Sequence, residues 1–112
     1  MKAVLINSKN NTVELIEVLD PNNNSVLEEW YKLCECTYVT TFYLYHLKSD
    51  MMFVVDDEGL LSDPKDFFIL PECNPVAGNA VVYGIDFETG ETIDWSVDLE
   101  WFRNEVKFRN LI

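Results

Sequence analysis

The chain has 112 residues, 48% of them hydrophobic and 13% aromatic, and its 20 acidic and 8 basic side chains give a net charge of -12. This length holds one domain with one core, which excludes a two-domain enzyme, and the hydrophobic content excludes intrinsic disorder. The negative charge argues against direct binding of nucleic acid or of anionic membrane surfaces, because both depend on Lys and Arg.

The charge is concentrated in one half of the chain. Residues 56–105 carry thirteen acids and two bases, whereas residues 1–55 carry seven acids and four bases. No stretch approaches the roughly eighteen apolar residues that a membrane-spanning helix needs, and the first residues lack the apolar run of a signal peptide. Three cysteines, an odd number, fit reduced thiols. We therefore expect a soluble protein of a bacterial cytoplasm.

The first half predicts a hairpin, a helix and two strands. Residues 3–7 and 12–18 are β-rich runs separated by an Asn-containing turn, which indicates a hairpin. Ser25 and Glu28 have the spacing of a capping box, and the apolar periodicity that follows predicts a helix over 25–35. The β-branched and aromatic runs 37–47 and 51–55 predict two further paired strands.

The second half predicts a long connection, a hairpin and a helix. Residues 56–78 contain three prolines and predict a loop with at most a helical turn near 64–68, and a loop of that length is more often functional than idle. Residues 79–87 and 91–95 predict a hairpin in which Gly90 adopts a positive φ. Ser96 is the predicted cap of a last helix whose apolar rows extend to Phe108, with Lys107 and Arg109 at its negative end.

These elements predict one α+β domain over residues 1–112, with a largely antiparallel sheet and two helices in the order β-β-α-β-β-loop-β-β-α.

Two groups of potential metal ligands are weak candidates. A zinc site would combine His46 with three cysteines, but the single residue between Cys34 and Cys36 is shorter than zinc sites use and should point the two sulfurs apart, so packing explains these thiols better. The acids of residues 56–66 resemble a calcium loop, yet the glycine comes too early and no glutamate closes the loop. The sequence therefore predicts no metal and no cofactor. With one histidine and no phosphate-binding glycine motif, it also predicts no catalytic site.

A series of acids near the C-terminus is the main candidate site. It is interleaved with Trp95 and Trp101, and the predicted partner-binding members are Asp86, Glu88, Glu91, Asp94, Asp98 and Glu100. Such a series is often only a solvated face. Alternatively, its carboxylates imitate the phosphates of DNA, which follow at about 1.7 Å per charge along the duplex, and so occupy the nucleic-acid site of a basic protein.

Two other functions stay open at this stage. The first is a small-ligand binder that sequesters a nucleotide signal beside the 56–78 loop, with ligand contacts from Tyr43, Tyr45, Asn74, Asn79 and Tyr83. Lys48, Lys65 or Arg103 would then have to offset the charge of an anionic ligand. The second is an enzyme that uses two carboxylates and a metal ion.

Residues 50–105 carry a resemblance to a known family. The strand and Asp-Glu-Gly turn of residues 53–61, followed by a proline-containing loop and the run Asn74–Gly84, are similar to small domains of unknown function found mostly in bacteriophages and bacterial mobile elements. Asn74 and Ala77 match the family's Asn-x-x-Ala spacing, whereas Cys73 departs from its pattern. The resemblance supplies no catalytic residue and implies a context, that of small acidic phage proteins that inhibit host defence.

The combined prediction is a non-enzymatic phage or mobile-element protein. It would inhibit a basic host defence protein that handles nucleic acid, such as a nuclease, through a surface that mimics DNA. Neither direct binding of nucleic acid nor binding to membranes is expected, and a homodimer stays open.

Overall fold

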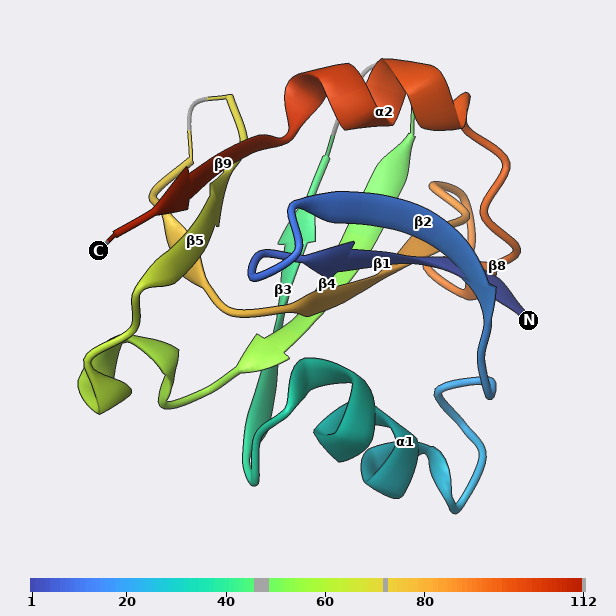
Figure 1. Cartoon of the computed structure of the whole chain (residues 1–112). Coiled ribbons are helices and arrows are strands. Elements are labelled where there is room, and N and C mark those ends of the chain that lie inside the picture. Colours follow the sequence, from blue (N-terminus) through green and yellow to red (C-terminus); the bar gives the residue numbers. More distant parts are fainter. Residues whose placement is uncertain (46–48, 72, 112) are drawn as a thin grey trace.

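The computed structural model describes residues 1–45, 49–71 and 73–111, and its elements are shown in Figure 1. In chain order they are β1 (Lys2–Asn7), β2 (Thr12–Glu17), α1 (Val26–Cys34), β3 (Val39–Leu44), β4 (Asp50–Asp56), the 3-10 helix η1 (Gly59–Ser62), β5 (Asp66–Ile69), β6 (Val76–Ala77), β7 (Ala80–Ile85), β8 (Thr92–Ile93), α2 (Leu99–Glu105) and β9 (Lys107–Asn110). None of the helices in these described residues is long and apolar enough to cross a membrane.

The strands form two antiparallel sheets. The larger has six strands in the order β2-β1-β7-β4-β3, with β8 pairing beside β7, and the smaller has the order β6-β5-β9. The predicted α+β class, with a largely antiparallel sheet and two helices, is confirmed.

The large sheet is the middle layer of the molecule. Helix α1 packs on one face, and α2 with the small sheet packs on the other (Figure 1). Residues 51–55 of β4 and 80–85 of β7 are buried whichever face they point to, which is why both strands are almost continuously apolar. On the α1 side the core centres on Trp30 and Tyr83, and on the α2 side on Phe53, Phe68 and Phe102.

The predicted loop over residues 56–78 is wrong in part. The helical turn lies at η1, before Pro64 rather than at 64–68, and two strands, β5 and β6, follow it. In β5 the side chain of Phe68 is fully buried and lies opposite Phe108 of β9. Residues 66–69 therefore form a strand because they pair with a segment about forty residues later in the chain.

The last helix is also shorter than predicted. It ends at Glu105, Val106 has extended backbone angles, and residues 107–110 form β9. Lys107 and Arg109 are exposed on this strand, not at a helix end, while Phe108 between them packs on the α2-side core. The alternation of apolar and polar residues over 106–109 fits a strand, and pairing with β5 selects it.

Helix α1 has the predicted Ser25 at its N-cap position, but the predicted capping box does not form. The hydroxyl of Ser25 makes no capping hydrogen bond, and Asn23 holds the entry of α1 by accepting hydrogen bonds from the amides of Ser25 and Val26. For α2 the N-cap is Asp98 rather than Ser96, and its carboxylate accepts a hydrogen bond of 3.1 Å from the amide of Glu100.

Substitution of this cap gives a measurable test. We expect Asp98→Ala to lower the free energy of unfolding by about 1 kcal/mol, because the amide of Glu100 loses its partner at the helix start. Ser96→Ala should change it by less than about 0.5 kcal/mol, as is usual for exposed positions without such a contact. Urea unfolding of both variants compares them, and equal losses would show that Asp98 does not act as the cap.

Candidate functional site

The acidic series begins at the turn between β7 and β8, which is built around Asp86. Its carboxylate accepts hydrogen bonds from the amides of Glu88 (2.8 Å) and Thr89 (3.2 Å), and its carbonyl oxygen accepts one from the amide of Gly90 (2.8 Å). Gly90 has a φ of 75°, which confirms the predicted role of glycine here. The turn thereby holds the side chains of Glu88 and Glu91 at the surface, where neither carboxylate contacts another described residue through a hydrogen bond or ion pair.

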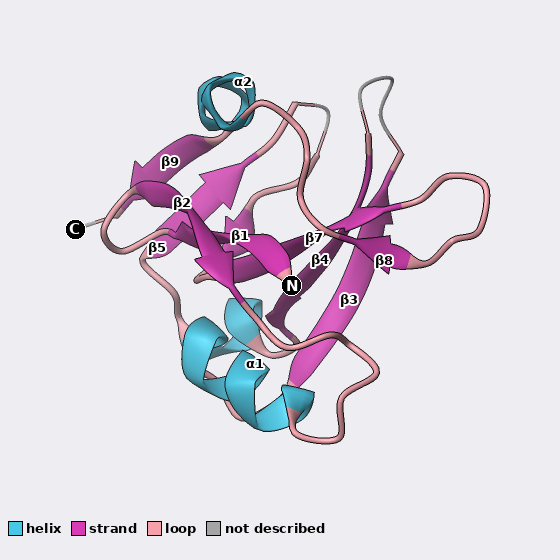
Figure 2. Cartoon of the chain, turned by 90° about the vertical axis from the view of Figure 1, so that its right-hand side faces the viewer, coloured by secondary structure: helices cyan, strands magenta, loops and turns pink. Residues whose placement is uncertain are grey.

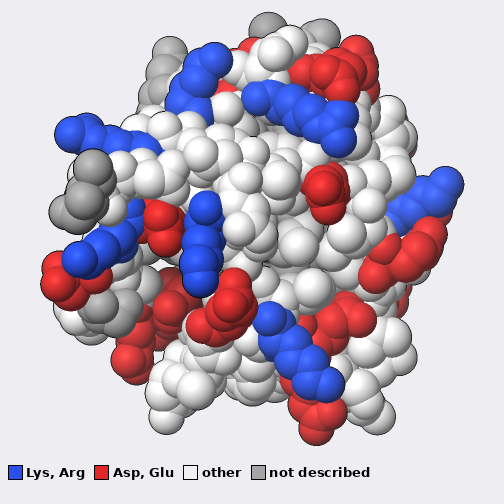
Figure 3. Space-filling model, viewed as in Figure 1, with Lys and Arg blue, Asp and Glu red and all other residues white. Residues whose placement is uncertain are grey.

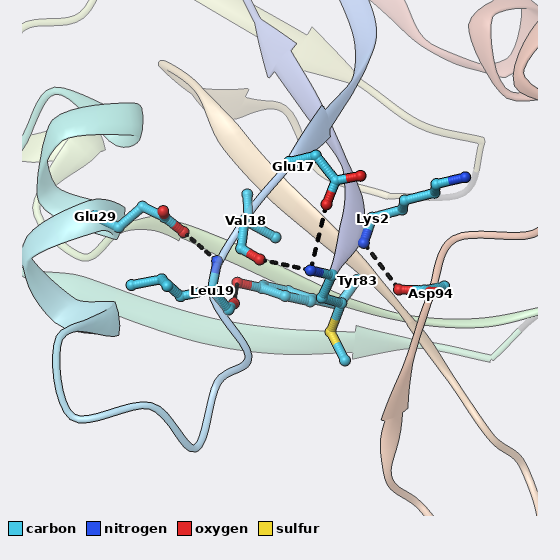
Figure 4. A network of polar contacts seen from close by, with 8 residues as sticks. Lys2, Glu17, Val18, Leu19, Glu29, Tyr83 and Asp94 are labelled. Carbon is cyan, nitrogen blue, oxygen red and sulfur yellow. Dashed lines mark hydrogen bonds and ion pairs between the residues drawn. The ribbon is translucent and has the colours of Figure 1, made fainter.

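Asp94 ties the segment after β8 to the start of β1. Its carboxylate accepts a hydrogen bond of 2.9 Å from the amide of Lys2 (Figure 4). The amide of Trp95 donates to the carbonyl oxygen of Lys2. The N-terminal amine next to it donates to the carbonyl oxygen of Val18 at 2.9 Å and pairs with Glu17 at 3.4 Å. Asp94 is therefore exposed but already carries a structural contact.

The first turn of α2 contributes Asp98 and Glu100. Asp98 caps the helix, and the carboxylate of Glu100 pairs with the guanidinium of Arg103 one turn later. The charge of Glu100 is thus partly neutralised within the chain. Of the six predicted partner-binding acids, only Glu88 and Glu91 have carboxylates without a contact inside the described chain.

We call the region formed by residues 86–91, Asp94 and residues 98–100 the acidic end. Figure 2 looks onto it, with the N-terminus toward the viewer, β8 to the right and α2 at the top. A groove of about 390 Å³ lies between the loop Asp20–Asn22 and residues Gly90–Thr92. Asp20 borders the groove on one side and Glu91 on the other, so a basic side chain entering it would meet a carboxylate on each wall.

Basic residues are unevenly distributed relative to this region. The chain has no Lys or Arg between Lys65 and Arg103, a stretch that contains the β7–β8 turn and the start of α2. The face seen in Figure 3, in contrast, shows Lys and Arg side chains interspersed with acids. The stretch that contains the β7–β8 turn therefore supplies no base of its own to offset its acids.

Phe87 is a surface residue that sequence reasoning missed. It was assigned to the end of a strand, but β7 ends at Ile85, and the side chain of Phe87 is 81% exposed at the tip of the turn between Asp86 and Glu88. Large aromatic side chains are enriched in protein interfaces, where they supply buried area at low entropic cost. The signal available in the sequence was its place directly after Asp86, a residue that favours turns.

The five residues of the ligand-binding alternative do not come together. Tyr43 and Tyr45 are exposed and stack on each other, with ring centroids 6.4 Å apart. Asn74 is exposed in the connection before β6, and Asn79 is buried where its side-chain amide donates to the carbonyl oxygen of Leu33 and to Glu35. Tyr83 is fully buried beneath α1.

Only Tyr45 of this set borders the cavity beside α2. That cavity of about 430 Å³ is also lined by Leu70, Pro71 and Cys73 of the predicted loop and by α2 residues including Trp101 and Glu105. Glu105 is the charged group among its described lining residues, so an anionic nucleotide would meet repulsion there. Lys65 and Arg103 are not among these lining residues, and His46 and Lys48 lie outside the described residues.

Tyr83 and Trp30 form a polar bridge inside the α1-side core. The indole Nε1 of Trp30 donates to the hydroxyl of Tyr83 at 2.9 Å, and this hydroxyl donates to the carbonyl oxygen of Leu19 at 3.0 Å. The amide of Leu19 donates to Glu29 of α1 at 2.8 Å (Figure 4). The bridge joins β7, α1 and the segment after β2, so the role of Tyr83 is structural.

The described members of the two groups of potential metal ligands do not assemble either. Within residues 1–45, 49–71 and 73–111, no three His, Cys, Asp or Glu side chains form a group that could hold a metal ion. Asp56 accepts a hydrogen bond from the amide of Glu58 in a local turn, and Asp66 accepts one from the side chain of Asn110. Cys34 and Cys36 are free thiols, and both residues pack against the α1-side core.

The buried thiol of Cys34 should be chemically inert. Burial, with a smaller effect of the neighbouring Cys36, raises the pKa of Cys34 to about 12, and its thiol lies 3.5 Å from the carbonyl oxygen of Val54. Because the thiolate is the reactive form, we expect iodoacetamide at pH 8 to leave Cys34 unmodified in the folded protein and to modify it in denaturant. Peptide mass spectrometry measures this, and rapid labelling of Cys34 without denaturant would contradict the described burial.

Comparisons with protein-family models, curated proteins and solved structures found no match to this chain. The resemblance of residues 50–105 to phage and mobile-element domains therefore stays a prediction from the sequence.

Proposed function

We propose that this chain is a non-catalytic binding protein that docks through its acidic end on a basic protein that handles nucleic acid, and inhibits it. The host protein would be part of a bacterial defence system, as the resemblance implies. The acidic end would occupy the surface that normally receives phosphates.

The observation that carries the proposal is how little of the negative charge is neutralised within the molecule. Among the described residues, ion pairs hold only the carboxylates of Glu17 and Glu100. At the β7–β8 turn, Glu88 and Glu91 are presented by a hydrogen-bonded backbone and are left for a partner. The hydrogen bonds of the turn fix its backbone before binding, so the backbone needs little further ordering, and the negative field raises the rate of encounter with a basic surface.

Phe87 supports a protein partner. An acidic face that only keeps a protein in solution gains nothing from an aromatic side chain at its outermost turn. In an interface, such a residue fills a pocket at the centre while charged residues surround it. Phe87 between Asp86 and Glu88 has this arrangement.

The test uses the two free carboxylates rather than the structural ones. Reversal of Asp86, Asp94 or Asp98 would remove hydrogen bonds that hold the fold, whereas Glu88→Lys with Glu91→Lys changes charge alone. The matched control is Asp57→Lys with Glu58→Lys, two exposed acids in the turn after β4 that cause the same change in net charge.

The immobilised chain is exposed to a bacterial lysate, and duplex DNA is then added at constant ionic strength. We expect retained basic proteins to be displaced by DNA, to be kept by the control variant, and to be lost from the Glu88/Glu91 variant and from Phe87→Ala. The proposal would be refuted if the amount of retained basic protein changed neither on addition of DNA nor with the charge reversal at the acidic end.

A further inference from the structure

Strand β3 is an open edge of the large sheet. It stands at the end of the strand order, pairs with β4 over its whole length from Val39 to Leu44, and has no partner strand among the described residues on its other side. Figure 2 shows it at the outer margin of the sheet. An open edge presents a row of backbone N–H and C=O groups that can pair with another strand.

The two edges of this sheet differ in how they are protected. The other edge strand, β2, carries Glu14 and Glu17, and the carbonyl oxygen of Val13 accepts a hydrogen bond of 2.9 Å from the guanidinium of Arg103. From Thr37 to Tyr45, in contrast, there is no charged residue and no proline. Charges, prolines and short length are the usual means by which edge strands avoid pairing, and β3 has none of them.

The side chains of β3 are also incompletely covered on the α1 face. Tyr43 lies opposite Met52, a residue of the α1-side core, so the two share that face. The side chain of Val39 at the start of the strand packs on this core, but Thr41 is exposed and Tyr43 is 49% exposed. Helix α1 therefore covers the beginning of β3 and leaves its end open.

We propose that two copies of this chain pair through β3, antiparallel, around a two-fold axis perpendicular to the sheet. Such an axis keeps the α1 faces of both copies on the same side of one continuous sheet. It places the start of β3 in one copy, which directly follows α1, beside the end of β3 in the other. The α1 end of each copy would thereby cover the exposed stack of Tyr43 and Tyr45 of its partner.

Charge favours a second copy over a basic protein as the occupant of this edge. A basic strand would find no acidic side chain on residues 37–45 to pair with. Two copies of β3 are both uncharged, so no like charges face each other when they pair. Repulsion between two chains of net charge -12 acts over longer distances, and salt screens it. Dimerisation should therefore strengthen as salt is added, opposite in sign to the binding of a basic partner.

Sedimentation equilibrium of the full chain tests this proposal at low and high salt. We expect the wild type to reach twice its monomer mass of 13.0 kDa, and to do so at lower concentration in high salt. Thr41→Lys puts a charge on the open edge and should give a monomer. Leu15→Lys, the same gain of charge at an exposed position of β2, is the matched control and should still dimerise.

Amide hydrogen exchange of the wild type supplies a readout that needs no variant. Residues 39–44 should exchange more slowly as the protein concentration rises. A wild type that stays at 13.0 kDa into the millimolar range would overturn the proposal and leave the edge to a strand of another protein. A dimer whose β3 exchange is independent of concentration, or that tolerates Thr41→Lys, would also overturn it. None of these results depends on whether the acidic end binds a basic protein.

Discussion

Replacing Phe53 by alanine should lower the free energy of unfolding by about 3–5 kcal/mol, the largest loss expected for a single substitution in this chain. Phe53 is fully buried in the centre of β4. Its ring stacks on Phe42 of β3 at 4.8 Å and on Phe68 of the small sheet at 6.4 Å. Truncation would remove the contact between the two sheets and leave a cavity where both meet.

Urea unfolding measures this loss, and Phe87→Ala is the matched control. Phe87 undergoes the same chemical change at a side chain that is 81% exposed, so its effect should stay within about 0.5 kcal/mol. Phe53→Leu keeps most of the volume and should cost clearly less than the alanine variant. Equal losses for Phe53→Ala and Phe87→Ala would show that Phe53 does not join the two sheets.

Removing one hydroxyl from the α1-side core should also destabilise the protein. Tyr83→Phe leaves the indole N–H of Trp30 and the carbonyl oxygen of Leu19 without their partner. An unsatisfied buried polar group costs about 1–3 kcal/mol, and we expect a loss of that size. Tyr45→Phe, at a hydroxyl that is exposed, is the control and should be close to neutral. A Tyr83→Phe variant as stable as the wild type would contradict the role assigned to this bridge.

The same variant has a signature at alkaline pH. Burial raises the pKa of Tyr83 from 10.0 to about 12, so the unfolded chain loses this proton at lower pH than the folded chain. The contribution of Tyr83 is therefore complete below pH 10 and is lost as the pH rises toward 12. Thermal unfolding across this range should show a shallower decline of stability for Tyr83→Phe than for the wild type.

The parts of the fold that were predicted correctly depend on local signals. The first hairpin, the pair of β3 and β4, and the hairpin closed by Gly90 each pair segments that are close in sequence, and the apolar periodicity of α1 lies within one short segment. Alternation, helical periodicity and a glycine with positive φ are visible within such short windows. The α+β class followed from them.

The small sheet was missed because its pairing is distant in sequence. Phe68 of β5 pairs with Phe108 of β9. Each strand has only four residues, too few for its own sequence pattern to predict a strand. A helix through Phe108 satisfied the apolar spacing equally well when the partner strand was unknown. The cap of α2 was misplaced for a related reason, since both Ser96 and Asp98 are good capping residues and the geometry selects the second.

The candidate site was also predictable only in part. The position of the acids along the chain was readable, but their hydrogen bonds were not. Asp94 binds the amide of Lys2, 92 residues away in sequence, which no local pattern indicates. Asp86 and Asp98 bind amides two residues on, in a turn and a helix cap that the structure selects among several possible ones. Structure also separates Glu88 and Glu91 from that set and exposes Phe87 beside them. Which acids are available to a partner is thus a product of the fold.

The most direct test of the acidic end is the affinity for the captured basic protein as a function of salt, measured for the wild type and the two double charge-reversal variants. We predict that affinity falls steeply with salt for the wild type and for Asp57→Lys with Glu58→Lys. Glu88→Lys with Glu91→Lys should bind roughly a hundredfold more weakly at low salt, because like charges placed opposite one another cost several kcal/mol, and should show a shallower salt dependence. Equal affinities of the two double variants, or a wild-type affinity that does not change with salt, would contradict the account.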